Sequence, residues 1–236
     1  MTTSKALVVV QSRFSSSRLR GKALYPLAGL PMVAFLIRRL KLSLPATSYK
    51  LVLATSDSEQ DDAVACWGEA EGIAVVRGSE DDVLRRYIQC LNLYDCPVLV
   101  RVTADNPLTC PEVLEQMVER HGRESLDYLE PKNLPLGAGV DVFRAETMRV
   151  LDQYATGSER EHINLHILEN SENFETGVMT FGGPLARPDL SMTIDTQDDW
   201  LRVAALFKSE EPEPWNISLE QAIARMDHTH LSRATA

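Results

Sequence analysis

A cluster of positive charge lies close to the start of the sequence, within the ten residues from 13 to 22. This stretch holds no acidic residue and four cations: Arg13, Arg18, Arg20 and Lys22. The whole chain of 236 residues, in contrast, carries a net charge of −10. Serines at 12 and 15–17 add hydroxyl donors. Because guanidinium and ammonium groups neutralise polyphosphates, the cluster predicts a site for a small, highly anionic ligand.

Two familiar phosphate-binding loops do not match this stretch. The dinucleotide motif Gly-x-Gly-x-x-Gly is absent, because Gly21 is the only glycine between residues 11 and 28. The P-loop motif is absent as well, because Ala23 follows Lys22 where that motif needs Ser or Thr to hold magnesium. The stretch is therefore predicted to be a phosphate-binding loop of another kind, and a solvated basic loop is the alternative.

The composition is that of an ordinary globular protein. Hydrophobic residues make up 44% of the chain and charged residues 25%, which is close to average. The acidic balance argues against nucleic acid as the main partner, because binding a phosphate backbone needs a broad basic face. The four cysteines lack Cys-x-x-Cys spacing, so we expect neither a disulfide framework nor a zinc site. The N-terminal apolar run ALVVV is too short for a signal peptide, and with no membrane-length run the expected location is cytoplasmic.

Short apolar runs alternate with amphipathic segments through the first half of the chain. The apolar runs predict strands at 6–11, 50–55, 73–78 and 97–105. The amphipathic segments predict helices at 31–43, 59–71, 79–94 and 111–122. Ser79 is the expected N-cap of the third helix, and Gly72 and Gly122 are expected at helix ends. Strands that alternate with crossover helices imply an α/β, doubly wound fold with a mostly parallel sheet.

The pattern becomes less regular after about residue 123. The segment 137–148 suggests a strand that leads into a helix, 158–170 looks strongly helical, and 191–209 suggests a strand followed by a last long helix. Pro- and Gly-rich stretches at 130–139 and 182–190 indicate long loops. Because no clear linker or repeat interrupts the chain, we expect one domain over residues 1–236.

The sequence resembles a known family along most of its length. The stretch QSRFSSSRLRGKALYPLAGLPMV, residues 11–33, is similar to the signature of cytidylyltransferases that activate acidic sugars. The most similar branch is the spore-coat-polysaccharide type, which is related to acylneuraminate and 3-deoxy-manno-octulosonate cytidylyltransferases. The resemblance continues in order through LATSD, VRGSEDDVLRRY, VRVTADNPLT, GVDVF, SEREHI and TIDTQDD. It covers about residues 6 to 205.

The resemblance implies a fold like that of nucleotide-diphospho-sugar transferases and a magnesium-dependent reaction. In that reaction CMP passes from CTP to a small acidic acceptor, of the 2-keto-3-deoxy sugar acid type, and pyrophosphate is released. The related enzymes imply a homodimer, which would pair through an extension at about residues 125–180 that also borders the acceptor site. No nucleic acid or membrane partner is expected.

The resemblance also implies roles for individual residues. Arg13 and Lys22 would hold the triphosphate, with Gln11 and Arg18 lining the pocket. The segment with Arg77 and Ser79 would lie near the base and ribose. Asp105 and Asp195 would be the magnesium carboxylates, and with Arg13 and Lys22 they form the expected catalytic set. Four further residues would face the acceptor or the dimer partner: Asp141, Glu159, Arg160 and His162.

Elementary chemistry supports the phosphate and metal assignments. Ligands of open parallel sheets bind beyond the carboxyl ends of the strands, where the basic loop and the two aspartates are predicted to lie. Phosphoryl transfer needs mainly positioned positive charge, and magnesium takes one or two carboxylates together with substrate phosphates. As alternatives, Asp105 could be a turn residue and Asp195 a helix N-cap. His162 and His166 lack the partners of a zinc site.

Other functions remain open at this stage. Base identity is not fixed by a side-chain motif, so a guanylyltransferase of the same family is one alternative. A nucleotide-sugar-dependent glycosyltransferase and a catalytically silent nucleotide-binding protein are two others. The chain departs from the family pattern at Arg20, where proline is usual, and at Arg85, where an acid is common. These departures could loosen the loop or favour a more acidic acceptor, such as a phosphonate or a highly carboxylated sugar.

Overall fold

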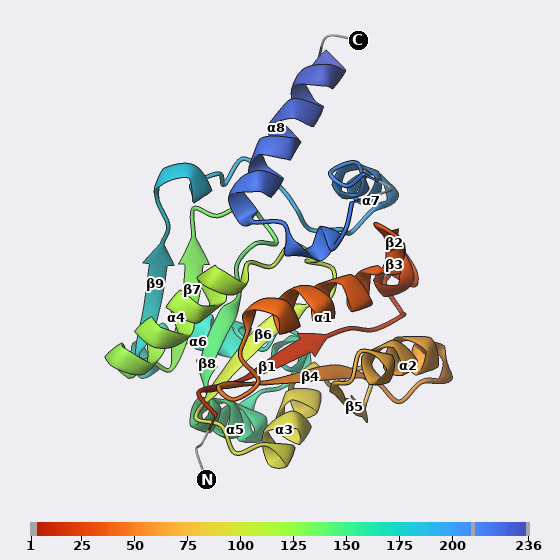
Figure 1. Cartoon of the computed structure of the whole chain (residues 1–236). Helices are drawn as coiled ribbons and strands as arrows, with labels where there is room; N and C mark the ends of the chain where they lie inside the picture. The colour runs from red at the N-terminus through yellow and green to blue at the C-terminus, as the bar shows by residue number, and fades with distance from the viewer. Residues whose placement is uncertain (1–3, 209–210, 235–236) are drawn as a thin grey trace.

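A seven-stranded sheet forms the centre of this computed structural model, which describes residues 4–208 and 211–234 (Figure 1). Its strands stand side by side in the following order: β5 (Ala74–Gly78), β4 (Tyr49–Ser56), β1 (Ala6–Gln11), β6 (Val98–Thr103), β8 (Asp141–Arg144), β7 (Tyr128–Lys132) and β9 (Thr176–Thr180). A small hairpin of β2 (Pro26–Leu27) and β3 (Leu30–Pro31) lies apart from it.

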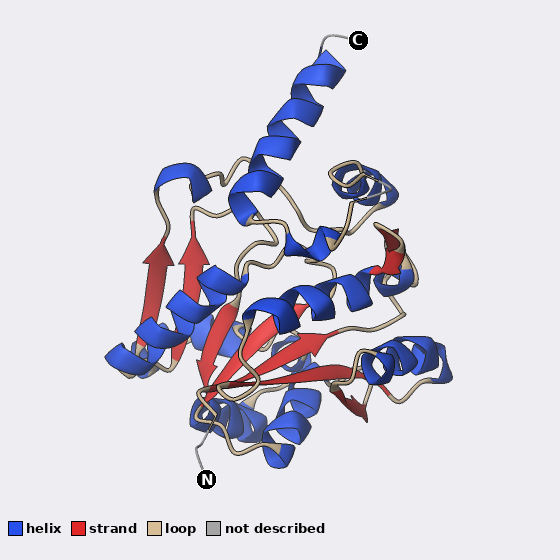
Figure 2. Cartoon of the chain, in the orientation of Figure 1, coloured by secondary structure: helices blue, strands red, loops and turns tan. Residues whose placement is uncertain are grey.

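Helices cover both faces of the sheet (Figure 2). The longer ones are α1 (Met32–Ser43), α2 (Asp62–Ala70), α3 (Val83–Leu93), α4 (Pro111–Glu124), α5 (Ala145–Tyr154), α7 (Gln197–Ala204) and α8 (Leu219–Ala234). The side chains of β1 alternate between the two faces. Ala6, Val8 and Val10 pack into the core with α1 and α4, whereas Leu7 and Val9 pack into the core with α3 and α5. The doubly wound α/β fold predicted from the apolar runs is therefore confirmed. The runs are apolar throughout because these strands are buried on both faces of the sheet.

The strand order contains a topological switch point between β1 and β6. From β1 the chain passes through parallel crossovers to β4 and then to β5, which extends the sheet in one direction. It then returns to place β6 parallel to β1 on its other side. In open α/β sheets, ligands bind in the crevice that such a reversal leaves beyond the carboxyl ends of the strands. The crevice of this protein is therefore expected next to Gln11 and Thr103.

The second half of the sheet differs from the sequence-based expectation. β8 runs antiparallel to both β6 and β7, and β9 lies parallel to β7 at the edge. The strands β7 and β9 were not predicted. The predicted strand within 191–209 does not form, because the backbone of this extended segment bonds to loops: Met192 N–H donates to Leu136 O and Ile194 N–H to Asp105 O. The expected long helix there is the short α7, and the long C-terminal helix is α8.

Several predicted helix ends were also wrong. α3 is capped by Asp82, whose carboxylate accepts the Arg85 N–H, while the hydroxyl of Ser79 accepts the Asp82 N–H one turn earlier. α4 runs through Gly122 and ends at Ser125, which takes a left-handed conformation with φ 52°. The segment 158–170 is only partly helical, with a 3₁₀ turn at Gly157–Arg160 and a short α6 (Leu165–Glu169). Among the described helices, none combines the length and the apolar character that a membrane span requires.

Candidate active site

The basic loop follows β1 and is anchored at Phe14. The buried carboxylate of Asp61 accepts the Phe14 N–H at 2.7 Å, and the Phe14 carbonyl accepts the Gly21 N–H at 2.8 Å. Gly21 has φ +69°, and a Cβ at this position would come within 2.7 Å of the Phe14 ring. These contacts close the loop on itself, so glycine is required here and the cations between 13 and 22 stand at fixed places.

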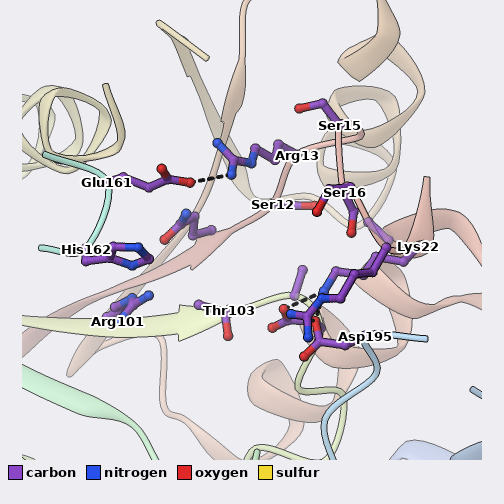
Figure 3. A pocket seen from close by; sticks show the side chains of 16 residues that line it. Ser12, Arg13, Ser15, Ser16, Lys22, Arg101, Thr103, Glu161, His162 and Asp195 are labelled. Carbon is purple, nitrogen blue, oxygen red and sulfur yellow. Dashed lines mark hydrogen bonds and ion pairs between the residues drawn. The ribbon is translucent and has the colours of Figure 1, made fainter. Parts of the chain in front are cut away.

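A cavity of about 340 Å³ opens beside this loop at the switch point (Figure 3). The first cavity, as we call it, is bounded by Gln11, the basic loop, the end of β6, Asp195, and the residues Glu161 and His162 of the extension. Of the predicted residues, seven line it: Gln11, Arg13, Arg18, Lys22, Asp105, His162 and Asp195. The structure therefore gathers the phosphate and metal candidates at the predicted edge of the sheet.

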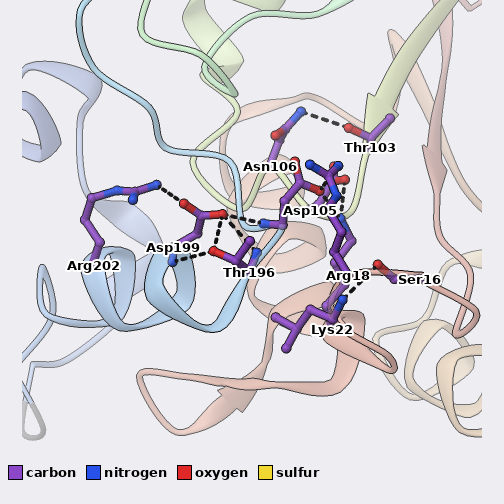
Figure 4. A network of polar contacts seen from close by, with 11 residues as sticks. Ser16, Arg18, Lys22, Thr103, Asp105, Asn106, Thr196, Asp199 and Arg202 are labelled. Carbon is purple, nitrogen blue, oxygen red and sulfur yellow. Dashed lines mark hydrogen bonds and ion pairs between the residues drawn. The ribbon is translucent and has the colours of Figure 1, made fainter.

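Lys22 joins the two predicted magnesium carboxylates (Figure 4). Its Nζ lies 2.7 Å from Asp105 Oδ2 and 2.7 Å from Asp195 Oδ1. A guanidinium nitrogen of Arg18 lies 3.0 Å from the same Asp195 oxygen. The two aspartates stand ninety positions apart in the sequence, and the Ile194 N–H bonds to the Asp105 carbonyl at 2.8 Å to hold their segments together.

Neither aspartate side chain is used to build its local structure. α7 is capped by Thr196, whose hydroxyl accepts the Asp199 N–H. The carboxylate of Asp199 in turn accepts the Thr196 N–H. Asp195 is therefore not the N-cap. Asp105 lies in a turn, but the contact of its carboxylate is with Lys22. Both carboxylates are instead paired with cations of the basic loop.

The donor set suits a magnesium ion that is shared with phosphates. Both carboxylates already lie around one cation, the Lys22 ammonium, at hydrogen-bond distance. Within residues 4–208 and 211–234 no group of three or more His, Cys, Asp or Glu side chains could hold a metal ion. Magnesium commonly accepts one or two protein carboxylates and completes its shell with phosphate oxygens and water. The carboxylates of Asp105 and Asp195 fit this coordination preference of magnesium.

The opposite side of the first cavity is formed by Arg13 and the extension. Arg13 Nη2 donates to Glu161 Oε1 at 2.6 Å, and this hydrogen bond lowers the pKa of Glu161. Figure 3 shows this pair facing the cavity across from Lys22 and Asp195. Gln11 Oε1 accepts a hydrogen bond from the hydroxyl of Tyr87 at 2.9 Å. The guanidinium of Arg13 is thus paired, but with a partner that an anionic ligand can replace.

Four predicted site residues lie elsewhere and are engaged in local structure. Arg77 binds Asp62 and the carbonyls of Ser56 and Ser58, and Ser79 accepts the Asp82 N–H. The other two belong to the extension: Arg160 pairs with Asp82 and Asp152, and Glu159 binds the Thr156 N–H and His166. None of the four lines the first cavity. The bonds to Thr156 and then to His166 lower the pKa of Glu159.

A second cavity of about 310 Å³ adjoins the first. It is lined mainly by the loop between β7 and β8, together with Asn106, Asp141, Arg101 and Thr103, and the last two also line the first cavity. Asp141, predicted to face the acceptor, is therefore in the second cavity. The sequence analysis missed Arg101, although a lone cation within the apolar run VLVRVT could have indicated it.

Comparison with known proteins identifies the family of the chain. The model of the cytidylyltransferase family matches residues 7–224. The spore coat polysaccharide biosynthesis protein SpsF of Bacillus subtilis is 30% identical over 230 residues, which cover 94% of this chain and 93% of SpsF.

Two solved structures share the fold. A cytidylyltransferase from Leptospira borgpetersenii superposes with a TM-score of 0.87 at 24% identity, covering 97% of this chain and 96% of that one. The structure of CMP:2-keto-3-deoxy-manno-octonic acid synthetase complexed with CTP has a TM-score of 0.65 at 18% identity, covering 86% and 98%. The family model and the similarity to SpsF confirm the family inferred from the sequence motifs, and with it nucleotidyltransferase activity. The chain belongs to the cytidylyltransferase family.

Proposed function

We propose that this protein transfers CMP from CTP to a small acidic sugar and releases pyrophosphate, with Mg²⁺ held by Asp105 and Asp195. The observation that carries the proposal is the placement of Lys22 between these two carboxylates, beside the basic loop and at the switch point of the sheet. The cytidylyltransferase family model points to cytidine as the base. The CMP:2-keto-3-deoxy-manno-octonic acid synthetase that shares the fold, solved in complex with CTP, points to a sugar acid as the acceptor.

The proposed transfer is an in-line displacement at the α-phosphorus of CTP. A hydroxyl oxygen of the acceptor forms a bond to that phosphorus while the bond to the bridging oxygen of the β-phosphate breaks. The electron pair of the broken bond leaves with pyrophosphate, and the hydroxyl proton passes to solvent.

The residues of the first cavity would bind and neutralise the triphosphate. Arg13, Arg18 and Lys22 offset the negative charge that grows on the leaving pyrophosphate, and such placed charges contribute most of the catalysis in phosphoryl transfer. Lys22 and Arg13 first exchange their carboxylate partners for phosphate oxygens. When bound, Mg²⁺ adds positive charge at the phosphate oxygens.

The two departures from the family pattern do not argue for an unusually acidic acceptor. Arg20 bonds to Gln60 at 2.8 Å and stacks over the ring of Phe14, while Arg85 pairs with Asp152 at 3.0 Å. Neither side chain lines the first or the second cavity. A simple sugar acid is therefore preferred to a phosphonate or a highly carboxylated sugar.

We also infer a homodimer that pairs through the extension at about residues 125–180. Five large apolar side chains of this region are exposed: Leu136 by 62%, Val150 by 39%, Tyr154 by 66%, Leu168 by 45% and Val178 by 39%. Burial of such side chains against a second copy would stabilise the pair. Sedimentation equilibrium at micromolar concentration should give about twice the 26.3 kDa of one chain, and Tyr154→Asp should shift the mass toward one chain. A free mass near 26.3 kDa for the unaltered protein would contradict the dimer.

The catalytic proposal is tested by pyrophosphate release. The protein is incubated with each of the four nucleoside triphosphates, Mg²⁺ and a panel of sugar acids. We expect release with CTP and a sugar acid, and loss of release when the metal is chelated. Release with GTP only would support the guanylyltransferase alternative. Transfer of sugar from a nucleotide sugar would instead support a glycosyltransferase.

A further inference from the structure

The second cavity stands where an acceptor would meet the nucleotide. Arg101 and Thr103 line both cavities and so form a wall that the two cavities share. A ligand in either cavity can contact this wall. An in-line transfer needs donor and acceptor on either side of the reacting phosphorus. Two adjoining cavities with a common wall provide that arrangement.

Arg101 is held at this wall by a network that begins in the extension. Its Nη1 donates to Asp141 Oδ2 at 3.1 Å, across the register pair that these residues form between β6 and β8. The hydroxyl of Tyr128 donates to Asp141 Oδ1 at 2.8 Å, and Asn164 Nδ2 donates to that hydroxyl at 3.2 Å. Both oxygens of Asp141 are therefore engaged: Oδ1 is held by Tyr128, and Oδ2 holds the guanidinium from one side.

The Arg101 guanidinium keeps unused hydrogen-bonding capacity. Its side chain is only 20% exposed, and its buried Nε has no hydrogen-bond partner among the described residues. In the same cavity the buried Oδ1 of Asn106 also lacks a partner within residues 4–208 and 211–234. Buried polar groups normally find partners, so an unpaired donor and acceptor at one cavity wall are features of a polar binding site.

The charges of the second cavity nearly cancel. Arg101 and Asp141 are its charged lining residues, and the rest of the described lining is amide, hydroxyl, proline, glycine or aliphatic. A ligand with one carboxylate can share the Arg101 guanidinium with Asp141. A ligand with a second negative charge would place that charge in a partly buried space where only the Asp141 carboxylate remains, and like charges repel strongly there.

We propose that the second cavity is the acceptor site, that Arg101 binds a single carboxylate of a polyhydroxylated acceptor, and that Asp141 excludes acceptors carrying a further phosphate. This inference rests on the proposed function and adds to it a residue pair that sets acceptor charge. Asp141 thus acts on specificity through its own charge, which repels a second anionic group on the acceptor.

The test compares two acceptors that share one carbon chain. The probes are 3-deoxy-manno-octulosonate and the same compound carrying a terminal phosphate, each with CTP and Mg²⁺, and the readout is kcat/KM from pyrophosphate release. The unaltered protein should use the first at least tenfold better than the second. Asp141→Asn should reduce this preference at least tenfold, because the repelling charge is gone while the amide preserves the shape.

Matched variants separate charge from structure. Tyr128→Phe removes the hydrogen bond to Asp141 but keeps its charge, so the preference should remain as in the unaltered protein. Arg101→Gln should raise the KM for the carboxylated probe at least tenfold. An unchanged preference in a folded Asp141→Asn variant would overturn the inference.

CTP binding distinguishes this inference from the proposed function. Calorimetry with CTP and Mg²⁺ measures occupation of the first cavity without an acceptor. If CTP binds but neither probe is used, the acceptor assignment is overturned while the nucleotide site stands. If CTP does not bind, the proposed function fails and this inference fails with it.

Discussion

Replacing Asp195 with asparagine is the sharpest test of the proposed metal site. The carboxylate accepts a hydrogen bond from Lys22 at 2.7 Å, forms an ion pair with Arg18 at 3.0 Å, and does not cap α7. Asparagine keeps the size and most of the hydrogen-bonding capacity but removes the charge. Lys22 retains Asp105 as a partner, so the folded state should lose only about 1 kcal/mol, the size of one ordinary hydrogen bond.

The effect on turnover should be much larger than the effect on stability. If this carboxylate holds the metal that offsets charge in the transition state, its loss should slow the reaction at least about a hundredfold, roughly 2.7 kcal/mol of activation free energy. The remaining activity should need more Mg²⁺. Asp105→Asn should behave in the same way, and the double variant should be little worse than either single one because the two act as a unit.

The assay is pyrophosphate release measured over a series of Mg²⁺ concentrations, with circular dichroism to confirm folding. Asp198→Asn provides the matched control. Asp198 is an exposed residue of α7, three positions after Asp195, and it does not line the first cavity. The control should match the unaltered protein in rate and in metal requirement. Near-normal turnover of Asp195→Asn with an unchanged Mg²⁺ requirement would refute the metal assignment.

Three further predictions concern nucleotide binding and stability. Glu161→Gln should tighten CTP binding in calorimetry by up to about tenfold, roughly 1.4 kcal/mol, because the triphosphate no longer has to displace a carboxylate from Arg13; weaker binding would mean that Glu161 presents Arg13 to the phosphate. Arg13→Ala should weaken CTP binding and turnover strongly, whereas Arg20→Pro should stay within about tenfold, since Arg20 lies outside both cavities; equal damage would show that loop shape dominates. Burial lowers the pKa of His121 from 6.5 to about 4. Between pH 4 and pH 6.5 the imidazole of His121 binds a proton in the unfolded chain but not in the folded protein. The free energy of unfolding therefore falls by about 3 kcal/mol as the pH drops from 6.5 to 4, and this loss is absent above pH 6.5. Urea unfolding of His121→Leu across this range should show a flatter pH dependence, and an unaltered slope would contradict the assignment.

The first half of the fold could be predicted because its strands are buried on both faces. A strand such as β1, with five of its six residues fully buried, has to be apolar along its whole length, and the sequence shows this directly. β9 gives no such signal. It is five residues long, lies at the edge of the sheet and has no buried residue, and β7 contains Pro131. The positions of β7 and β9 in the sheet depend on pairing with strands that are distant in the sequence. The local pattern of apolar and polar residues does not encode such pairing.

The site could be predicted in part, for a comparable reason. Lys22, Asp105 and Asp195 were identified through the resemblance and through their positions after expected strands, and the structure brings them together. Arg77 and Arg160 belong to equally good motifs, yet they bind neighbouring acids. Residue type and spacing show that a charge is present, but they do not distinguish a ligand contact from an internal ion pair.

The position of Lys22 also bears on how metal and nucleotide enter the site. The ammonium acts as a resident counter-ion for Asp105 and Asp195, so free Mg²⁺ has to compete with a cation that is already bound at 2.7 Å to each carboxylate. In the proposed site CTP would relieve this competition, because its phosphates would offer the ammonium another partner. Each ligand would then raise the affinity of the other, and by thermodynamic linkage the factor would be the same in both directions. We expect the resting enzyme to bind magnesium weakly on its own and to take up the metal together with the nucleotide.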